Sequence, residues 1–175
     1  MLKHKDQRVG VFVDVQNMYY SARNLYGSRV NFANILQQAV QDRKLIRAVA
    51  YVVKAEAPEE IKFFEALDKQ GFEVNMKDLQ VFVGGAKKGD WDVGITIDAV
   101  TMANKLDVVI LVTGDGDFVP LVQYLQFLGQ RVEVMAFIET TSAKLKEQAD
   151  DFFDLSEEKN KFLLRGRQGQ IRRSK

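Results

Sequence analysis

The stretch LDVVILVTGDGDF, residues 106–118, decides how this chain can fold. Residues 108–112 are a continuous run of valine, isoleucine and leucine, which is typical of a strand buried on both faces inside a parallel sheet. Asp115 and Asp117 follow where the strand ends, among glycines that allow a tight turn. Residues 118–128 then have the pattern of a helix. The two carboxylates therefore lie in a strand-to-helix loop, and in open α/β sheets such loops are where ligands bind.

Apolar runs and helical patterns alternate along the rest of the chain. We expect further strands at residues 9–15, 45–53, 72–76 and 130–137, and helices at 18–25, 32–41, 58–70, 91–105 and 142–150. Residues 78–83 are expected to be extended and 84–89 to form a mobile basic loop. Helix 91–105 is apolar around most of its circumference and is expected to be well buried. The alternation predicts an α/β fold, a three-layer α/β/α sandwich with a mostly parallel central sheet.

Composition limits the kinds of chemistry that are open to the chain. It has no cysteine and a single histidine, His4, which excludes disulfides, thiol nucleophiles, Cys/His zinc sites and histidine-based catalytic triads. With 46% hydrophobic and 28% charged residues, and no apolar run near the roughly 20 residues that span a bilayer, we expect a soluble protein. The N-terminus lacks a small-residue cleavage site, so we expect a cytoplasmic location.

The formal charge of +1 hides a strongly basic end of the chain. Residues 159–175 contain seven Lys or Arg and no acid, which leaves the preceding residues at −6. We therefore expect one domain, with a leader at residues 1–8, the folded domain at 9–155 and a basic tail at 156–175. The tail resembles arginine-rich segments that bind the RNA backbone, and a solvated terminus is the equally good alternative.

Acidic residues end two of the predicted strands and open one helix. Asp14 ends the first strand, Asp115 and Asp117 end the central one, and Asp92 begins the helix after the KKGDW loop. An aspartate at the end of any one strand more often forms a turn or caps a helix than binds a ligand. Because the carboxyl ends of parallel strands share one edge of a sheet, however, we expect these carboxylates to converge. Carboxylates so close together repel one another unless a cation neutralises their charge. A site with only oxygen ligands favours Mg²⁺ or Mn²⁺. A metal there can activate water for in-line attack on a phosphodiester.

Three motifs in order resemble one protein family: VFVDVQN at residues 11–17, KKGDWDVGITIDA at 87–99 and VTGDGDFVPLV at 112–122. Together they look like the NYN domain, a group of PIN-like nucleases, and especially its bacterial LabA-like branch. The resemblance implies a PIN-like fold and a metal-dependent endoribonuclease that hydrolyses RNA. It implies that the four aspartates above form the metal-binding and catalytic site. It also implies site roles for Asn17, Lys88 and Thr113. Asp98 matches a common family acid and is a secondary metal ligand, although it lies about 240° around an ideal helix from Asp92.

Several other assignments remain predictions. Lys87 and Lys88 could hold RNA phosphates at the rim, and Ser142 could meet a phosphate at a helix start, although ordinary capping is the more usual role. Tyr19, Tyr20 and Tyr26 could stack on bases, although helix aromatics more often pack into a core. The sequence leaves open whether the protein forms a homodimer. The alternative function is a catalytically weak RNA-binding or regulatory protein with the same fold.

Overall fold

A parallel β-sheet forms the centre of the molecule in the computed structural model, which describes residues 3–55, 57–85 and 87–164. Every pair of neighbouring strands in this sheet runs parallel. The order β4-β3-β1-β7-β8-β9 reverses direction between β1 and β7, as in doubly wound α/β folds. Its strands are β1 (Arg8–Asp14), β3 (Lys44–Lys54), β4 (Glu73–Asp78), β7 (Val108–Val112), β8 (Arg131–Ala136) and β9 (Asp151–Asp154).

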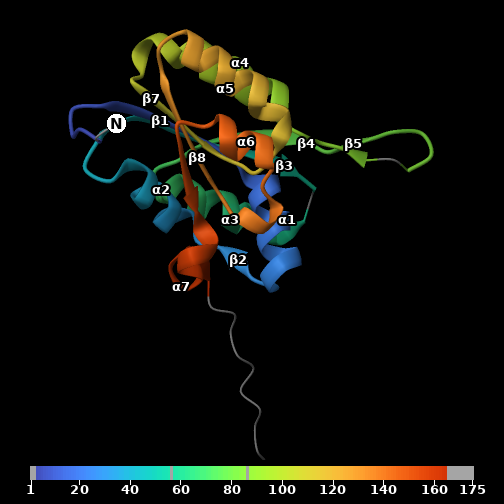
Figure 1. Ribbon diagram of the computed structural model, residues 1–175. Coiled ribbons are helices and arrows are strands. Elements are labelled where there is room, and N and C mark those ends of the chain that lie inside the picture. The colour runs from blue at the N-terminus through green and yellow to red at the C-terminus, as the bar shows by residue number, and fades with distance from the viewer. Residues whose placement is uncertain (1–2, 56, 86, 165–175) are drawn as a thin grey trace, which may run out of the picture.

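Helices cover both faces of the sheet, so the predicted α/β/α sandwich is confirmed (Figure 1). The α-helices are α1 (Val15–Tyr26), α2 (Phe32–Val40), α3 (Pro58–Lys69), α4 (Asp92–Met102), α5 (Val119–Phe127), α6 (Ala143–Gln148) and α7 (Lys159–Phe162). Alternation along β1 divides the core, because Val11 packs with α1 and α2 whereas Phe12 packs with α4 and α5. Short 3-10 helices are η1 (Ala103–Lys105), η2 (Gly116–Phe118), η3 (Ile138–Thr140) and η4 (Leu155–Glu158).

The first helix begins earlier than the sequence pattern predicts. We expected it from residue 18, but α1 starts at Val15, directly after β1. The reason is that the Asp14 carboxylate accepts a hydrogen bond from the backbone N–H of Asn17 and so caps the helix. The end of the strand and the start of the helix are therefore fixed by the same acidic side chain.

The expectation that helix 91–105 is well buried is wrong for its outer face. Ile95 and Ala99 of α4 are buried against the sheet, but Val93 is 70% exposed and Ile97 57% exposed. The helix covers the sheet from outside, and within the described part of the chain no further layer covers it. Its last predicted turn is the separate 3-10 helix η1, so α4 itself ends at Met102.

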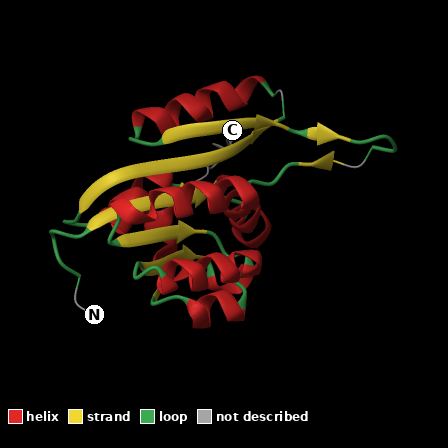
Figure 2. Cartoon of the chain, turned by 90° about the horizontal axis from the view of Figure 1, so that it is seen from above, coloured by secondary structure: helices red, strands yellow, loops and turns green. Residues whose placement is uncertain are grey.

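Two small antiparallel strand pairs complete the fold. Residues 78–89, expected as an extended segment and a loop, contain the paired strands β5 (Gln80–Val81) and β6 (Lys87–Lys88), and both views show this arm projecting from the body (Figures 1 and 2). Strand β10 (Leu163–Leu164) pairs with β2 (Arg29–Val30). The expected tail thus begins with folded structure up to residue 164, and residues 165–175 lie outside the described part. None of the described helices is long and apolar enough to cross a membrane.

Candidate metal centre

The predicted acidic residues meet where the strand order reverses. Strands β1 and β7 are neighbours, and the chain leaves them toward opposite faces of the sheet, which opens a crevice at their carboxyl ends. A hollow of about 370 Å³ lies there. It is lined by Asp14, Gln16, Asn17, Tyr20, Ser21, Asn24, Asp90, Asp92, Asp115 and Thr140. The prediction that distant acids converge on one edge of the sheet is therefore confirmed.

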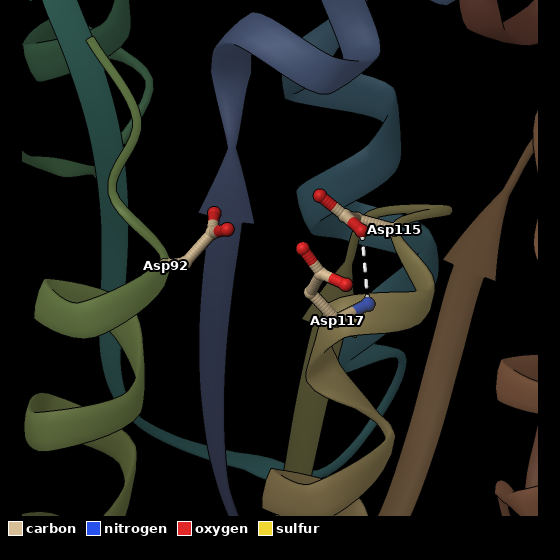
Figure 3. Close-up of side chains that lie close together, drawn as sticks. All are labelled: Asp92, Asp115 and Asp117. Carbon is tan, nitrogen blue, oxygen red and sulfur yellow. Dashed lines mark hydrogen bonds between the residues drawn. The ribbon is translucent and has the colours of Figure 1, made fainter. Parts of the chain in front are cut away.

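Three carboxylates form the group best placed to hold a cation. Asp92, Asp115 and Asp117 each offer one oxygen, and these oxygens all lie within 4.8 Å of one another. Figure 3 shows Asp92 reaching from the start of α4 toward the two aspartates of the turn after β7. The turn is held in shape because the Asp115 carboxylate accepts the backbone N–H of Asp117 at 2.9 Å. Negative charge from two separate elements is thus concentrated at one point.

Asp14 lines the same hollow but lies outside this group of three. It is only 8% exposed, and its pKa is raised from 3.8 to about 6. Burial is the largest cause, and the charges of Asp92 and Asp115 raise the pKa further, whereas the hydrogen bonds from Asn17 and Thr113 oppose the shift. When no cation is near, the ionised form of the Asp14 carboxylate is therefore destabilised.

Hydrogen bonds tie the ends of β1 and β7 together. The Thr113 hydroxyl donates to Asp14 at 3.3 Å and accepts the backbone N–H of Asp115 at 3.2 Å. The Asn17 side-chain oxygen accepts the backbone N–H of Gly114 at 2.9 Å. Thr113 is 1% exposed, so it lies beneath the acids with little surface to offer a substrate.

The start of α4 is anchored by a tryptophan next to Asp92. The indole N–H of Trp91 donates to the backbone oxygen of Val52 in β3, and its ring packs on Tyr51. Gly94 fits beneath this ring, because a Cβ there would lie 2.5 Å from it. Asp92 is thereby fixed at the rim, and its pKa is raised by burial and then by Asp115, Asp90 and Asp117.

The remaining predicted site residues have different positions. Asp98 lies outside the group of three carboxylates found among the described residues, and it accepts hydrogen bonds from the hydroxyl of Tyr51 and the amide of Asn75. The helix geometry that set Asp98 apart from Asp92 explains this. Ser142 caps α6, accepting the backbone N–H of Leu145, which is its ordinary structural role. The side chain of Lys88 lies outside the described part of the chain.

On the α1 side of the hollow, Tyr20 was predicted as a ring that could stack on bases, but Gln16 and Asn24, which line the hollow with it, were not predicted. The spacing of four residues would have shown a common helix face if the early start of α1 had been recognised. Lys77 was not predicted either, and its ammonium group donates to the backbone oxygen of Asp90 and lies over the Trp91 ring. Lys77 is thus a cation fixed beside the acidic group.

Comparisons with known proteins agree with this architecture. The NYN domain profile matches residues 8–156. The low amplitude and bright protein LabA of Synechococcus elongatus is 23% identical over 161 residues, covering 87% of this chain and 86% of that protein. A crystal structure of a protein of unknown function from Vibrio parahaemolyticus is 38% identical, with a TM-score of 0.84, and covers 94% of this chain and all of that one. The profile match over most of the length shows that this chain belongs to the NYN domain family.

Proposed function

We propose that the protein is a metal-dependent endoribonuclease of the cytoplasm that hydrolyses RNA phosphodiester bonds at its acidic hollow. The observation that carries the proposal is the convergence of Asp92, Asp115 and Asp117 beside the buried Asp14. Membership of the NYN family, a PIN-like nuclease group, supports the same reaction. An arrangement that only stabilised the fold would not gather four like charges in a solvent-accessible crevice.

The residues of the hollow fit a hard divalent cation. Their donor atoms are carboxylate oxygens, with no histidine or cysteine among them, which suits Mg²⁺ or Mn²⁺. Burial and the neighbouring carboxylates raise the pKa values of Asp14 and Asp92, so a bound cation would stabilise their charged forms. Asp92, Asp115 and Asp117 would hold the ion, with Asp14 next to it. When bound, such an ion lowers the pKa of water and stabilises negative charge on a phosphoryl group.

The chain's own side chains supply position and proton acceptance. Asp14 lies at the end of β1 next to the proposed ion, where we propose that its carboxylate orients the attacking water and accepts its proton. Asn17 and Thr113 keep Asp14 and the turn after β7 in register through the hydrogen bonds described above. Asn17 also lines the hollow, where we propose that it contacts water or substrate. An RNA phosphate that enters the hollow would therefore meet side chains whose positions are already fixed by hydrogen bonds.

Positive charge around the hollow would offset the repulsion between RNA and the acids. Lys77 is fixed beside Asp90, and we propose that Lys88 on the neighbouring hairpin contacts phosphate. Two of the seven basic residues near the C-terminus are engaged within the domain, because Lys159 lies over the Tyr26 ring and Lys161 donates to Gln38. The proposal that the tail binds RNA therefore concerns the arginines and the lysine beyond residue 164.

Cleavage of a labelled single-stranded RNA tests the proposal. The wild-type protein is incubated with Mg²⁺ or Mn²⁺ and, separately, with EDTA, alongside Asp92→Asn and Asp117→Asn. Asp42→Asn is the matched control, because Asp42 is an exposed aspartate in the turn before β3 and does not line the hollow. We expect metal-dependent products from the wild type and from Asp42→Asn, and a large loss of products for the other two variants.

Two outcomes would overturn the proposal. Cleavage that continues unchanged in EDTA, or in Asp92→Asn and Asp117→Asn, would separate the reaction from the acidic group. Binding of RNA without cleavage in either metal would favour the alternative, an RNA-binding or regulatory protein with an NYN fold.

A further inference from the structure

One wall of the acidic hollow carries an aromatic ring between two amides. Gln16, Tyr20 and Asn24 follow one another at intervals of four residues on α1, and all three line the hollow. At a rise of about 1.5 Å per residue, this row runs about 12 Å along the helix away from the acids. Tyr20 is 48% exposed, although it is a large apolar ring. We call Gln16, Tyr20 and Asn24 the α1 wall.

The other two tyrosines of α1 have different surroundings, although Tyr19 is itself 42% exposed. Tyr26 packs edge-on against Phe137 at 5.4 Å, and its hydroxyl donates to Glu139 at 2.7 Å, so it serves the core. Tyr19 meets Tyr20 edge to face at 5.4 Å between ring centres, and Tyr19 does not line the hollow. That contact supports the Tyr20 ring from one side. Tyr20 is thus braced against a neighbouring ring at the border of the hollow.

We propose that the α1 wall is a base-binding subsite for single-stranded RNA, in which one base stacks on the Tyr20 ring. Single-stranded nucleic acid is bound by stacking unpaired bases on aromatic side chains and by hydrogen bonds to the base edges. Gln16 and Asn24 each carry an amide that can donate and accept, which matches base edges. The subsite extends the proposed function, because it seats a nucleotide beside the phosphate that the acids would process.

The proposal also predicts which form of RNA enters. A base can reach a side chain on the wall of the hollow only if it is splayed out of a helix, because bases inside a duplex have both faces covered by stacking. The α1 wall starts next to Asp14, since Gln16 is two residues beyond it. A single strand lying along α1 would therefore bring its backbone to the acids and its base to Tyr20.

Binding of a short fluorescent single-stranded RNA tests the subsite. The measurement is made by anisotropy in Mg²⁺, in an Asp92→Asn background that is used to suppress cleavage, and it compares Tyr20→Ala with Tyr20→Phe. Tyr124→Ala is the matched control, because Tyr124 is also 48% exposed but lies on α5 outside the hollow. We expect Tyr20→Ala to weaken binding about tenfold, the usual effect of losing one stacked base, and the other two to stay within about twofold. With an abasic oligonucleotide the effect of Tyr20→Ala should disappear.

Each outcome bears on one proposal or the other. Equal binding by Tyr20→Ala and its parent, or an equal loss with the abasic strand, would overturn the subsite. Tyr20-dependent binding by a wild-type protein that cuts no RNA in Mg²⁺ or Mn²⁺ would leave the subsite standing and overturn the nuclease. Metal-dependent cutting with an unchanged KM in Tyr20→Ala would overturn the subsite and leave the nuclease standing. If the Asp92→Asn parent protein binds no RNA even at low salt, both proposals are overturned.

Discussion

Replacing Asp14 by asparagine should stabilise the metal-free protein at neutral and alkaline pH. The fold raises the pKa of this carboxyl group from 3.8 to about 6. Because the folded state binds the proton more tightly than the unfolded chain, the resulting stability is fully present below pH 3.8 and is lost as the pH rises through 6. A shift of about 2 pKa units, at 1.36 kcal/mol each, corresponds to about 3 kcal/mol lost by pH 8.

Asparagine resembles the protonated carboxyl group, so the variant avoids this loss. Its amide oxygen can still accept the N–H of Asn17, but its amide nitrogen cannot accept the Thr113 hydroxyl as the carboxylate does. That mismatch costs about 1 kcal/mol, which leaves a net gain of about 2 kcal/mol at pH 8. At pH values well below 3.8 the gain disappears, because the wild-type carboxyl group is itself neutral.

Urea unfolding followed by circular dichroism, in EDTA and at a series of pH values on both sides of 6, measures this difference. Asp107→Asn is the control of opposite sign, because the exposed ion pair with Arg8 lowers the pKa of Asp107 and its contribution to stability is lost as the pH falls. If wild type and Asp14→Asn showed the same dependence of unfolding free energy on pH, or if Asp14→Asn were the less stable protein at pH 8, the reasoning about buried charge would be refuted.

Three further substitutions test how the site and core are held. Thr113→Val should lower the unfolding free energy by about 1–3 kcal/mol, because it removes the hydroxyl that joins the two strand ends; an unchanged urea midpoint would contradict that role. Gly114→Ala should cost about 1–3 kcal/mol in the same assay, since its Cβ would lie 2.9 Å from the backbone oxygen of Thr140; full stability would mean that the turn adapts freely. Glu133→Gln should cost about 3–5 kcal/mol because it removes the negative charge that lies 2.9 Å from the buried Arg43 guanidinium, and a melting temperature equal to that of wild type would count against it.

Much of the fold could be predicted because buried parallel strands read as unbroken apolar runs. The run at residues 108–112 became β7, with all five residues buried. The convergence of Asp14 with Asp115 followed from parallel pairing alone, since parallel strands end at the same edge. These features depend on local patterns and on one rule of topology, both of which the sequence displays.

What could not be predicted depends on packing between distant segments. The apolar circumference of α4 does not reveal that no layer covers Val93 and Ile97, because sequence pattern records apolarity and not neighbours. The burial of Thr113 beneath the acids arises from three elements meeting at one point. The α1 wall was hidden for a local reason, because the Asp14 cap starts α1 at Val15, three residues before the sequence pattern predicts a helix.

The strand order has a consequence for a chain that is still being synthesised. Strands β1, β3 and β4 lie together on one side and come from the first half of the sequence, whereas β7 occupies the other flank of β1 and arrives about a hundred residues after it. A ribosome-bound fragment that ends before residue 92 has Asp14 but none of the three carboxylates of the proposed cation site. The acidic group is thus assembled late in translation, and a chain that ends before residue 92 lacks the residues on which the proposed activity depends.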